Sequence, residues 1–169
     1  MKIALVRYGA VPEVARCGIP ESLSVHRDDE VVVQTHRGLE GGRVLEFAKP
    51  IHEPGQTAPE PSFQIERLKT DADRQQEVNH RARIQAEFDT WNDRILEWDL
   101  DLQLIEMDWT LDGKKLVLYV LNERGPECTK LALQAAAAGL GIVEVQPVSS
   151  EGPVAMPSTG GGCGSCGSH

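Results

Sequence analysis

Hydrophobic and polar positions change their spacing along the chain, and these changes mark the predicted elements. Short apolar runs over residues 2–7, 31–35 and 42–47 are typical of strands, and glycines mark the turn between the last two. Short strands separated by turns predict a small β-barrel or curled sheet over residues 1–52. Residues 53–61 contain three prolines and one glycine, so we expect a linker there rather than a helix or a central strand.

A second unit is predicted over residues 62–148, and a long helix is its main feature. Residues 63–68 predict a short strand, and Thr70 is a candidate N-cap for a helix over residues 71–97. The first turns, residues 73–77, are polar all round, so we expect them to be solvated or used by a partner. Further along, apolar residues recur at steps of four and three, the spacing of one helix face: Ile84, Phe88, Trp91, Ile95 and Trp98. The expected shared core is Phe88, Trp91, Ile95, Met107, Leu118 and Val143.

A hairpin is predicted to follow the helix. Ile105, Met107 and Trp109 alternate with polar residues, which indicates a strand with one buried face. Asp112-Gly113 is a signal for a type I′ turn. Residues 116–121 are apolar on both faces, so we expect a central strand.

The remaining pattern completes the predicted fold. Pro126 favours the start of a helix that runs to about residue 138, and residues 142–148 predict the last strand. From residue 63 the order is strand, helix, strand, strand, helix, strand, which is the ferredoxin-like βαββαβ pattern. The predicted fold class is therefore α+β, with a β-rich N-terminal unit, a ferredoxin-like unit and a flexible tail. The tail, residues 149–169, is rich in Gly, Ser and Pro.

Composition narrows the function classes. The formal net charge of −9 argues against a general binder of the phosphate backbone, which needs clustered Lys and Arg. The chain has no run of about 18 apolar residues, so we expect no membrane insertion. Its first residues lack the pattern of a signal peptide, and we expect a cytoplasmic protein.

The tail holds the one motif with metal chemistry. Cys163 and Cys166 have the CxxC spacing of a metal knuckle, and His169 adds an imidazole. This is half a site, so zinc or an iron–sulfur cluster would need further ligands from a partner. The alternative is a tail with two free thiols. The other cysteines, Cys17 and Cys128, are expected to be small core residues.

Two segments carry a family resemblance. Residues 33–44 read VQTHRGLEGGRV, which resembles the pattern V-x-T-x-R-G-x-E-x-G-x-V, and residues 100–119 resemble L-x-L-x-x-x-x-x-x-T-x-D-G-x-K-x-x-F-Y. The chain is thus similar to the PSP family (polymerase-suppressor protein C-terminal conserved region) and to bacterial YaaT/RicT-type regulatory proteins. The family-like turn comprises Arg37, Gly38, Glu40 and Gly42. Arg37 and Glu40 are expected to pair with each other or to cap the strand ends.

The chain departs from the family pattern in two places. Where the family usually has G-R-V-D-F-R-x-L, residues 124–131 read RGPECTKL. Cys128 therefore stands in place of a Phe. Beyond the core, most of the cysteines that the family uses for iron–sulfur clusters are missing.

The resemblance implies a non-enzymatic regulatory adaptor. Its expected partners are small helical proteins and an RNase Y-type nuclease, so that it would act on RNA processing. The alternative is an RNA- or DNA-contacting module that uses the ferredoxin-like sheet, which would need exposed aromatic and basic residues. An enzyme ranks third: Glu106 and Asp108 share a strand face, but a solvated sheet face explains them more simply, because no candidate base or nucleophile accompanies them.

Overall fold

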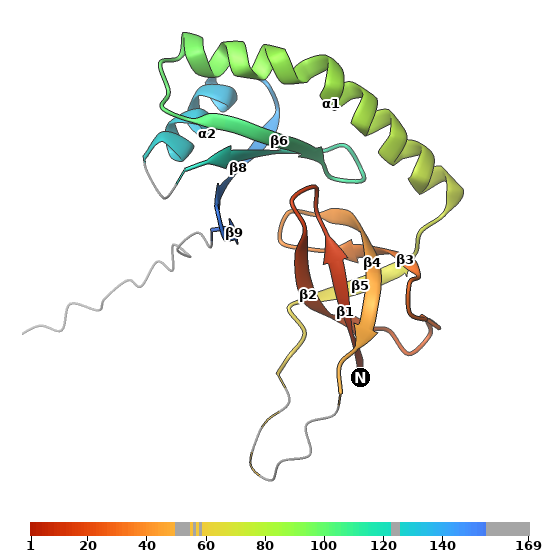
Figure 1. The fold of residues 1–169 in the computed structure, drawn as a ribbon. Coiled ribbons are helices and arrows are strands. Elements are labelled where there is room, and N and C mark those ends of the chain that lie inside the picture. The colour runs from red at the N-terminus through yellow and green to blue at the C-terminus, as the bar shows by residue number, and fades with distance from the viewer. Residues whose placement is uncertain (50–54, 56, 58, 123–125, 155–169) are drawn as a thin grey trace, which may run out of the picture.

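The N-terminal part of the chain folds into a closed β-barrel. The computed structural model describes residues 1–49, 55, 57, 59–122 and 126–154, and these residues give a mixed α+β fold (Figure 1). The barrel strands follow the order β1-β2-β5-β3-β4, and β4 closes on β1. They are β1 (Lys2–Tyr8), β2 (Glu13–Ile19), β3 (Glu30–Gln34), β4 (Leu39–Phe47) and β5 (Phe63–Leu68). Apolar side chains that alternate along these strands fill the interior: Ala4, Val6, Cys17, Ile19, Val31, Val33, Val44 and Ile65.

Strand β5 corrects the predicted ferredoxin-like order. The sequence predicts residues 63–68 as the first strand of the second unit, but β5 pairs antiparallel with β3 and parallel with β2. Without β5 both neighbours would expose an open edge, so closing the barrel satisfies their backbone groups. The division into residues 1–52 and 62–148 stays a prediction, and most of the expected linker 53–61 lies outside the described residues.

The second sheet has two helices on one face. Its order is β6-β7-β8-β9, from β6 (Gln103–Trp109), β7 (Lys115–Leu121), β8 (Ile142–Ser149) and β9 (Gly152–Pro153). Helices α1 (Asp71–Glu97) and α2 (Glu127–Ala137) pack on it (Figure 1). The expected shared core is confirmed, with Phe88 and Val143 partly buried and the rest buried. The expected central strand is confirmed too, because β7 lies between β6 and β8.

Helix α1 begins where the sequence predicts and is tied to the barrel. The Thr70 hydroxyl accepts the Asp73 N–H at 3.2 Å, and the Asp73 carboxylate accepts the Thr70 N–H at 2.8 Å, which forms a capping box. Asp73 is buried and pairs with Arg67 of β5, while Arg74 Nε lies 2.8 Å from the Glu30 carboxylate of β3. The first turns were expected to be solvated or used by a partner. Asp73 and Arg74 contact the barrel instead, because β5 leads directly into the helix, whereas Gln75 and Gln76 are exposed.

The β6–β7 hairpin differs from its prediction in two details. A β-bulge shifts the register between Leu104 and Glu106, so Leu104 is buried and Ile105 is 41% exposed, although Ile105 was expected on the buried face. The type I′ turn is also wrong, because that turn needs positive φ at both central residues and only Gly113 has it (φ 69°). The hairpin closes through the Thr110 N–H, which donates to the Lys115 carbonyl at 3.0 Å.

The C-terminal end of the described chain extends the sheet. Strand β9 pairs antiparallel with β8, so part of the expected tail, residues 149–154, is structured. The rest of the tail lies outside the described residues. Within the described chain, neither helix is long and apolar enough to cross a membrane.

Candidate functional site

The barrel and the second sheet meet through two barrel hairpins. The N–H of Ala10, in the β1–β2 turn, donates to Asp108 Oδ2 on β6 at 3.1 Å. The N–H of Leu111 donates to the Leu39 carbonyl at the start of β4 at 2.7 Å. Val11 packs on the sheet face that the helices leave open, against Val117, Tyr119 and Val148. Both barrel hairpins therefore contact the second sheet, and the junction is held by backbone, charge and apolar contacts together.

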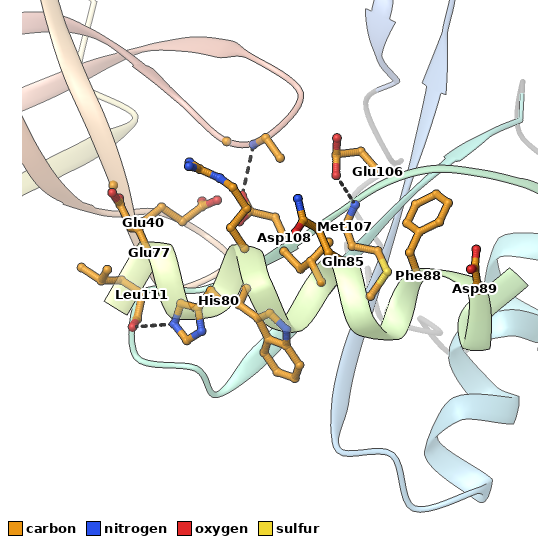
Figure 2. Close-up of a pocket in the computed structure, with 16 residues that line it drawn as sticks. Glu40, Glu77, His80, Gln85, Phe88, Asp89, Glu106, Met107, Asp108 and Leu111 are labelled. Carbon is orange, nitrogen blue, oxygen red and sulfur yellow. Dashed lines mark hydrogen bonds between the residues drawn. The ribbon is translucent and has the colours of Figure 1, made fainter. Parts of the chain in front are cut away.

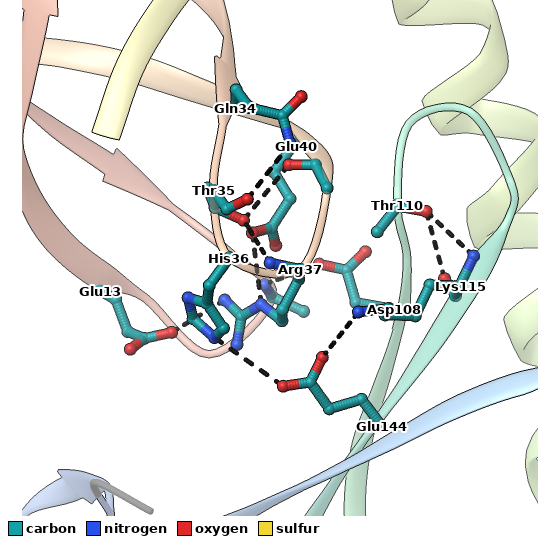
Figure 3. Close-up of polar contacts among 12 residues, drawn as sticks. Glu13, Gln34, Thr35, His36, Arg37, Glu40, Asp108, Thr110, Lys115 and Glu144 are labelled. Atoms are coloured by element: carbon teal, nitrogen blue, oxygen red, sulfur yellow. Dashed lines mark hydrogen bonds and ion pairs between the residues drawn. The ribbon is translucent and has the colours of Figure 1, made fainter. Parts of the chain in front are cut away.

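A buried arginine lies at the centre of this junction (Figure 3). The Arg37 side chain is 0% exposed; its Nη2 lies 2.9 Å from Glu13 Oε2, and its Nε lies 3.2 Å from Glu40 Oε2. The expected Arg37–Glu40 pair is therefore present. The guanidinium also stacks over two rings, with centroid distances of 5.6 Å to Tyr8 and 5.9 Å to Tyr119. Burial lowers the pKa of Arg37, but the nearby carboxylates outweigh it and hold the pKa above its ordinary value.

Two glycines of the family-like turn have clear structural roles. Gly38 adopts a φ of +130° at the tip of the β3–β4 hairpin, a conformation that side chains rarely adopt. A Cβ on Gly42 would lie 2.6 Å from Val6 Cγ1, so β4 and β1 approach closely only because this residue has no side chain. The structure thus brings Arg37, Gly38 and Glu40 to the junction and places Gly42 in the barrel wall. A binding role for the four stays a prediction.

Asp108 is the residue whose environment the sequence missed. Its carboxyl was expected on a solvated sheet face, but the face is covered by the β1–β2 turn, whose Ala10 N–H it accepts. Burial, and then the negative charge of Glu40, raise the pKa of Asp108 to about 7. The covering turn is about 100 residues away in the chain, so no local pattern reveals it.

A groove of about 740 Å³ opens beside this junction (Figure 2). One wall is α1, the other is β6, and the barrel closes one end. Its apolar lining includes Ile84, Phe88, Met107 and Leu111, and its carboxylates are Glu40, Glu77, Asp89, Glu106 and Asp108. The sequence indicates the helix wall only weakly, through polar residues that recur every four positions on one face of α1: Glu77, Arg81, Gln85 and Asp89. The volume lies in the range of ligand-binding clefts, roughly 300–1,000 Å³.

Some of these charges are already paired and others are not. Lys69 Nζ lies 2.8 Å from Glu77 Oε1, and Arg37 pairs with Glu40. Asp89 is exposed, and neither it nor Glu106 has a cationic partner among the described residues. The groove therefore keeps negative charge at Asp89 and Glu106 beside an apolar lining and the cationic side chain of Arg81.

The predicted metal ligands cannot be placed. Cys163, Cys166 and His169 lie outside the described residues, and zinc or iron–sulfur binding by them stays a prediction. Within the described part of the chain, no group of three His, Cys, Asp or Glu side chains is arranged to hold a metal. Cys17 and Cys128 are buried, as expected for core residues, and burial raises the pKa of both thiols, that of Cys17 to about 11.

Comparison with known proteins gives one informative relative. No family model matches the chain, and no solved structure matches it. The chain is 24% identical over 148 residues to the stage 0 sporulation protein YaaT of Bacillus subtilis (strain 168). The match covers 88% of this chain and 52% of the relative, so the chain spans about half the length of the curated relative it matches. The resemblance drawn from the sequence motifs is thus confirmed: the chain is related to YaaT.

Proposed function

We propose that this chain is a non-enzymatic cytoplasmic adaptor, a regulatory subunit that binds other proteins through the groove between α1, β6 and the barrel. The observation that carries the proposal is the groove itself, with its apolar lining and its unpaired carboxylates Asp89 and Glu106. The relative is a sporulation-stage protein by name, which supports a role in regulating a developmental step.

The family resemblance suggests what the adaptor serves. Its partners would be small helical proteins and an RNase Y-type nuclease, and its output would be altered RNA processing. In the same proposal the tail residues Cys163, Cys166 and His169 would respond to metal or redox state, with zinc or an iron–sulfur cluster completed by ligands from a partner.

An RNA- or DNA-contacting module has less support. Base stacking on the second sheet would need exposed aromatic side chains. Tyr119 of β7 is 0% exposed beneath the barrel hairpins, and Trp109 of β6 lies under Arg83, whose guanidinium carbon is 4.1 Å from the ring centroid. Salt-dependent binding of RNA by the purified chain would favour this alternative over the adaptor.

Affinity capture from native lysate tests the adaptor proposal. The bait is wild type, the groove variant Asp89→Lys with Glu106→Lys, or a control, Glu97→Lys, whose exposed carboxylate lies on the same helix outside the groove lining. A partner identified by mass spectrometry should be captured by wild type and control and lost from the groove variant. Equal capture by all three baits would contradict the groove as the binding surface.

A further inference from the structure

The groove is bordered by an open sheet edge. Strand β6 is the terminal strand of the β6-β7-β8-β9 sheet. Thr110 donates its N–H to Lys115 of β7, and the antiparallel alternation then turns the peptide groups of Asp108 and Glu106 toward β7 as well. Those of Met107 and Trp109 face the open edge. The Met107 N–H agrees with this, because it donates to Glu106 Oε1 at 3.0 Å instead of to β7.

The edge is accessible in the middle and closed at one end. At Leu111 the edge is occupied by the barrel, since the Leu111 N–H donates to the Leu39 carbonyl of β4. From Glu106 to Trp109 the strand lines the groove, with α1 on the other side (Figure 2). An unpaired strand edge next to a cavity is a template for a further strand.

The side chains beside the edge define which strand fits. Side chains alternate between the faces of a sheet, so an added strand would direct every second residue toward the face that carries Glu106. The residues between them would point toward the helix side, where Ile84 and Phe88 line the groove. Opposite charges across neighbouring strands are favourable and like charges are unfavourable. An added strand should therefore alternate basic and apolar residues.

We propose that the groove binds an extended segment of a partner protein as an additional strand on β6, and that this segment alternates basic with apolar residues. The inference rests on the proposed adaptor function and specifies how that function recognises its partner. The carboxylate of Glu106 disfavours a second copy of β6, which carries the same charge, and favours a basic strand.

The test uses synthetic peptides as probes of the full-length chain. The first peptide has seven residues, the length of β6, and alternates lysine with valine. A second replaces lysine with glutamate. Two further peptides keep the lysine sequence but are N-methylated on every second backbone nitrogen, one in each phase. Binding is measured by fluorescence anisotropy, and the protection of the β6 amides by hydrogen exchange.

The lysine peptide should bind and slow amide exchange at Met107 and Trp109, while the glutamate peptide should bind at least tenfold more weakly. One methylated phase should lose roughly tenfold in affinity, because its methyl groups face β6 and remove hydrogen bonds, a loss of about 1.4 kcal/mol. The other phase should bind as the parent does. Asp89→Lys with Glu106→Lys should weaken the lysine peptide, and Glu97→Lys should not.

The outcomes separate the two proposals. If the lysine peptide binds and the groove variant weakens it, but both methylated phases bind as well as the parent, strand addition is overturned and the groove remains a basic-partner site. If the lysine peptide fails to bind at all, the strand proposal is overturned. The adaptor function then depends on the capture experiment alone, which uses no peptide.

Discussion

Replacing Arg37 with methionine tests whether the buried charge network stabilises the barrel hairpins that meet the second sheet. Methionine keeps much of the side-chain length but leaves the carboxylates of Glu13 and Glu40 without their cation. Removing one partner of a buried ion pair costs roughly 3–5 kcal/mol, because the remaining charge stays buried. Glu40 is only 5% exposed and bears this cost in full, whereas Glu13 is 25% exposed and can regain water. We therefore expect Arg37→Met to lower the free energy of unfolding by about 3 kcal/mol.

The assay is urea unfolding followed by circular dichroism, with Lys130→Met as the matched control. Lys130 also pairs with a carboxylate, Glu127, but its side chain is 58% exposed, so its loss should cost less than about 0.5 kcal/mol. Adding Glu40→Gln to Arg37→Met should recover part of the lost free energy of unfolding, because it removes the buried carboxylate that has no cation beside it. A cost below about 1 kcal/mol for Arg37→Met, or no recovery in the double variant, would refute this account of the buried charge network.

Three further predictions concern other parts of the molecule. Asp108 has a pKa of about 7 in the folded state and about 3.9 in the unfolded state, so the folded state holds an extra proton between these pH values, and the free energy of unfolding should fall as pH rises from about 4 to 7. Asp108→Asn should flatten that dependence and raise the free energy of unfolding by about 2 kcal/mol at pH 8. Identical pH profiles for wild type and variant would contradict this prediction. Trp91→Ala should cost about 3–5 kcal/mol in the same urea assay, since Trp91 is 2% exposed in the core under α1. A complex purified with its partner should contain zinc or iron that is lost in Cys163→Ser with Cys166→Ser, and equal metal content in both preparations would remove the tail from the proposal.

Local signals in the sequence predicted the elements well where the elements depend on neighbouring residues. The capping box at Thr70 and Asp73 fixes the start of α1, and the four–three spacing through Trp91 and Ile95 identifies its buried face. The central strand β7 was recognisable because it is apolar on both faces. Strand β2 was missed, since Arg16 and Gly18 interrupt an apolar pattern that is already short.

Pairings between distant segments were not predictable in the same way. Strand β5 reads equally well as the start of a ferredoxin-like unit and as a barrel strand, and only the open edges of β2 and β3 decide between them. The groove and the burial of Asp108 depend on the same long-range choice, because a barrel that is closed by β5 brings the β1–β2 turn onto β6. The bulge at Ile105 adds a local change of face that strict alternation cannot express.

The central claim is that the groove between α1, β6 and the barrel is where a partner protein binds. Site-specific photo-crosslinking in cells tests it most directly, with a benzophenone amino acid replacing Gln85, which is exposed on the groove wall, or Leu133, which is 65% exposed on α2 outside the groove. The account predicts that one partner is cross-linked from position 85 and not from position 133. Cross-linking of that partner from position 133 with none from position 85 would contradict it.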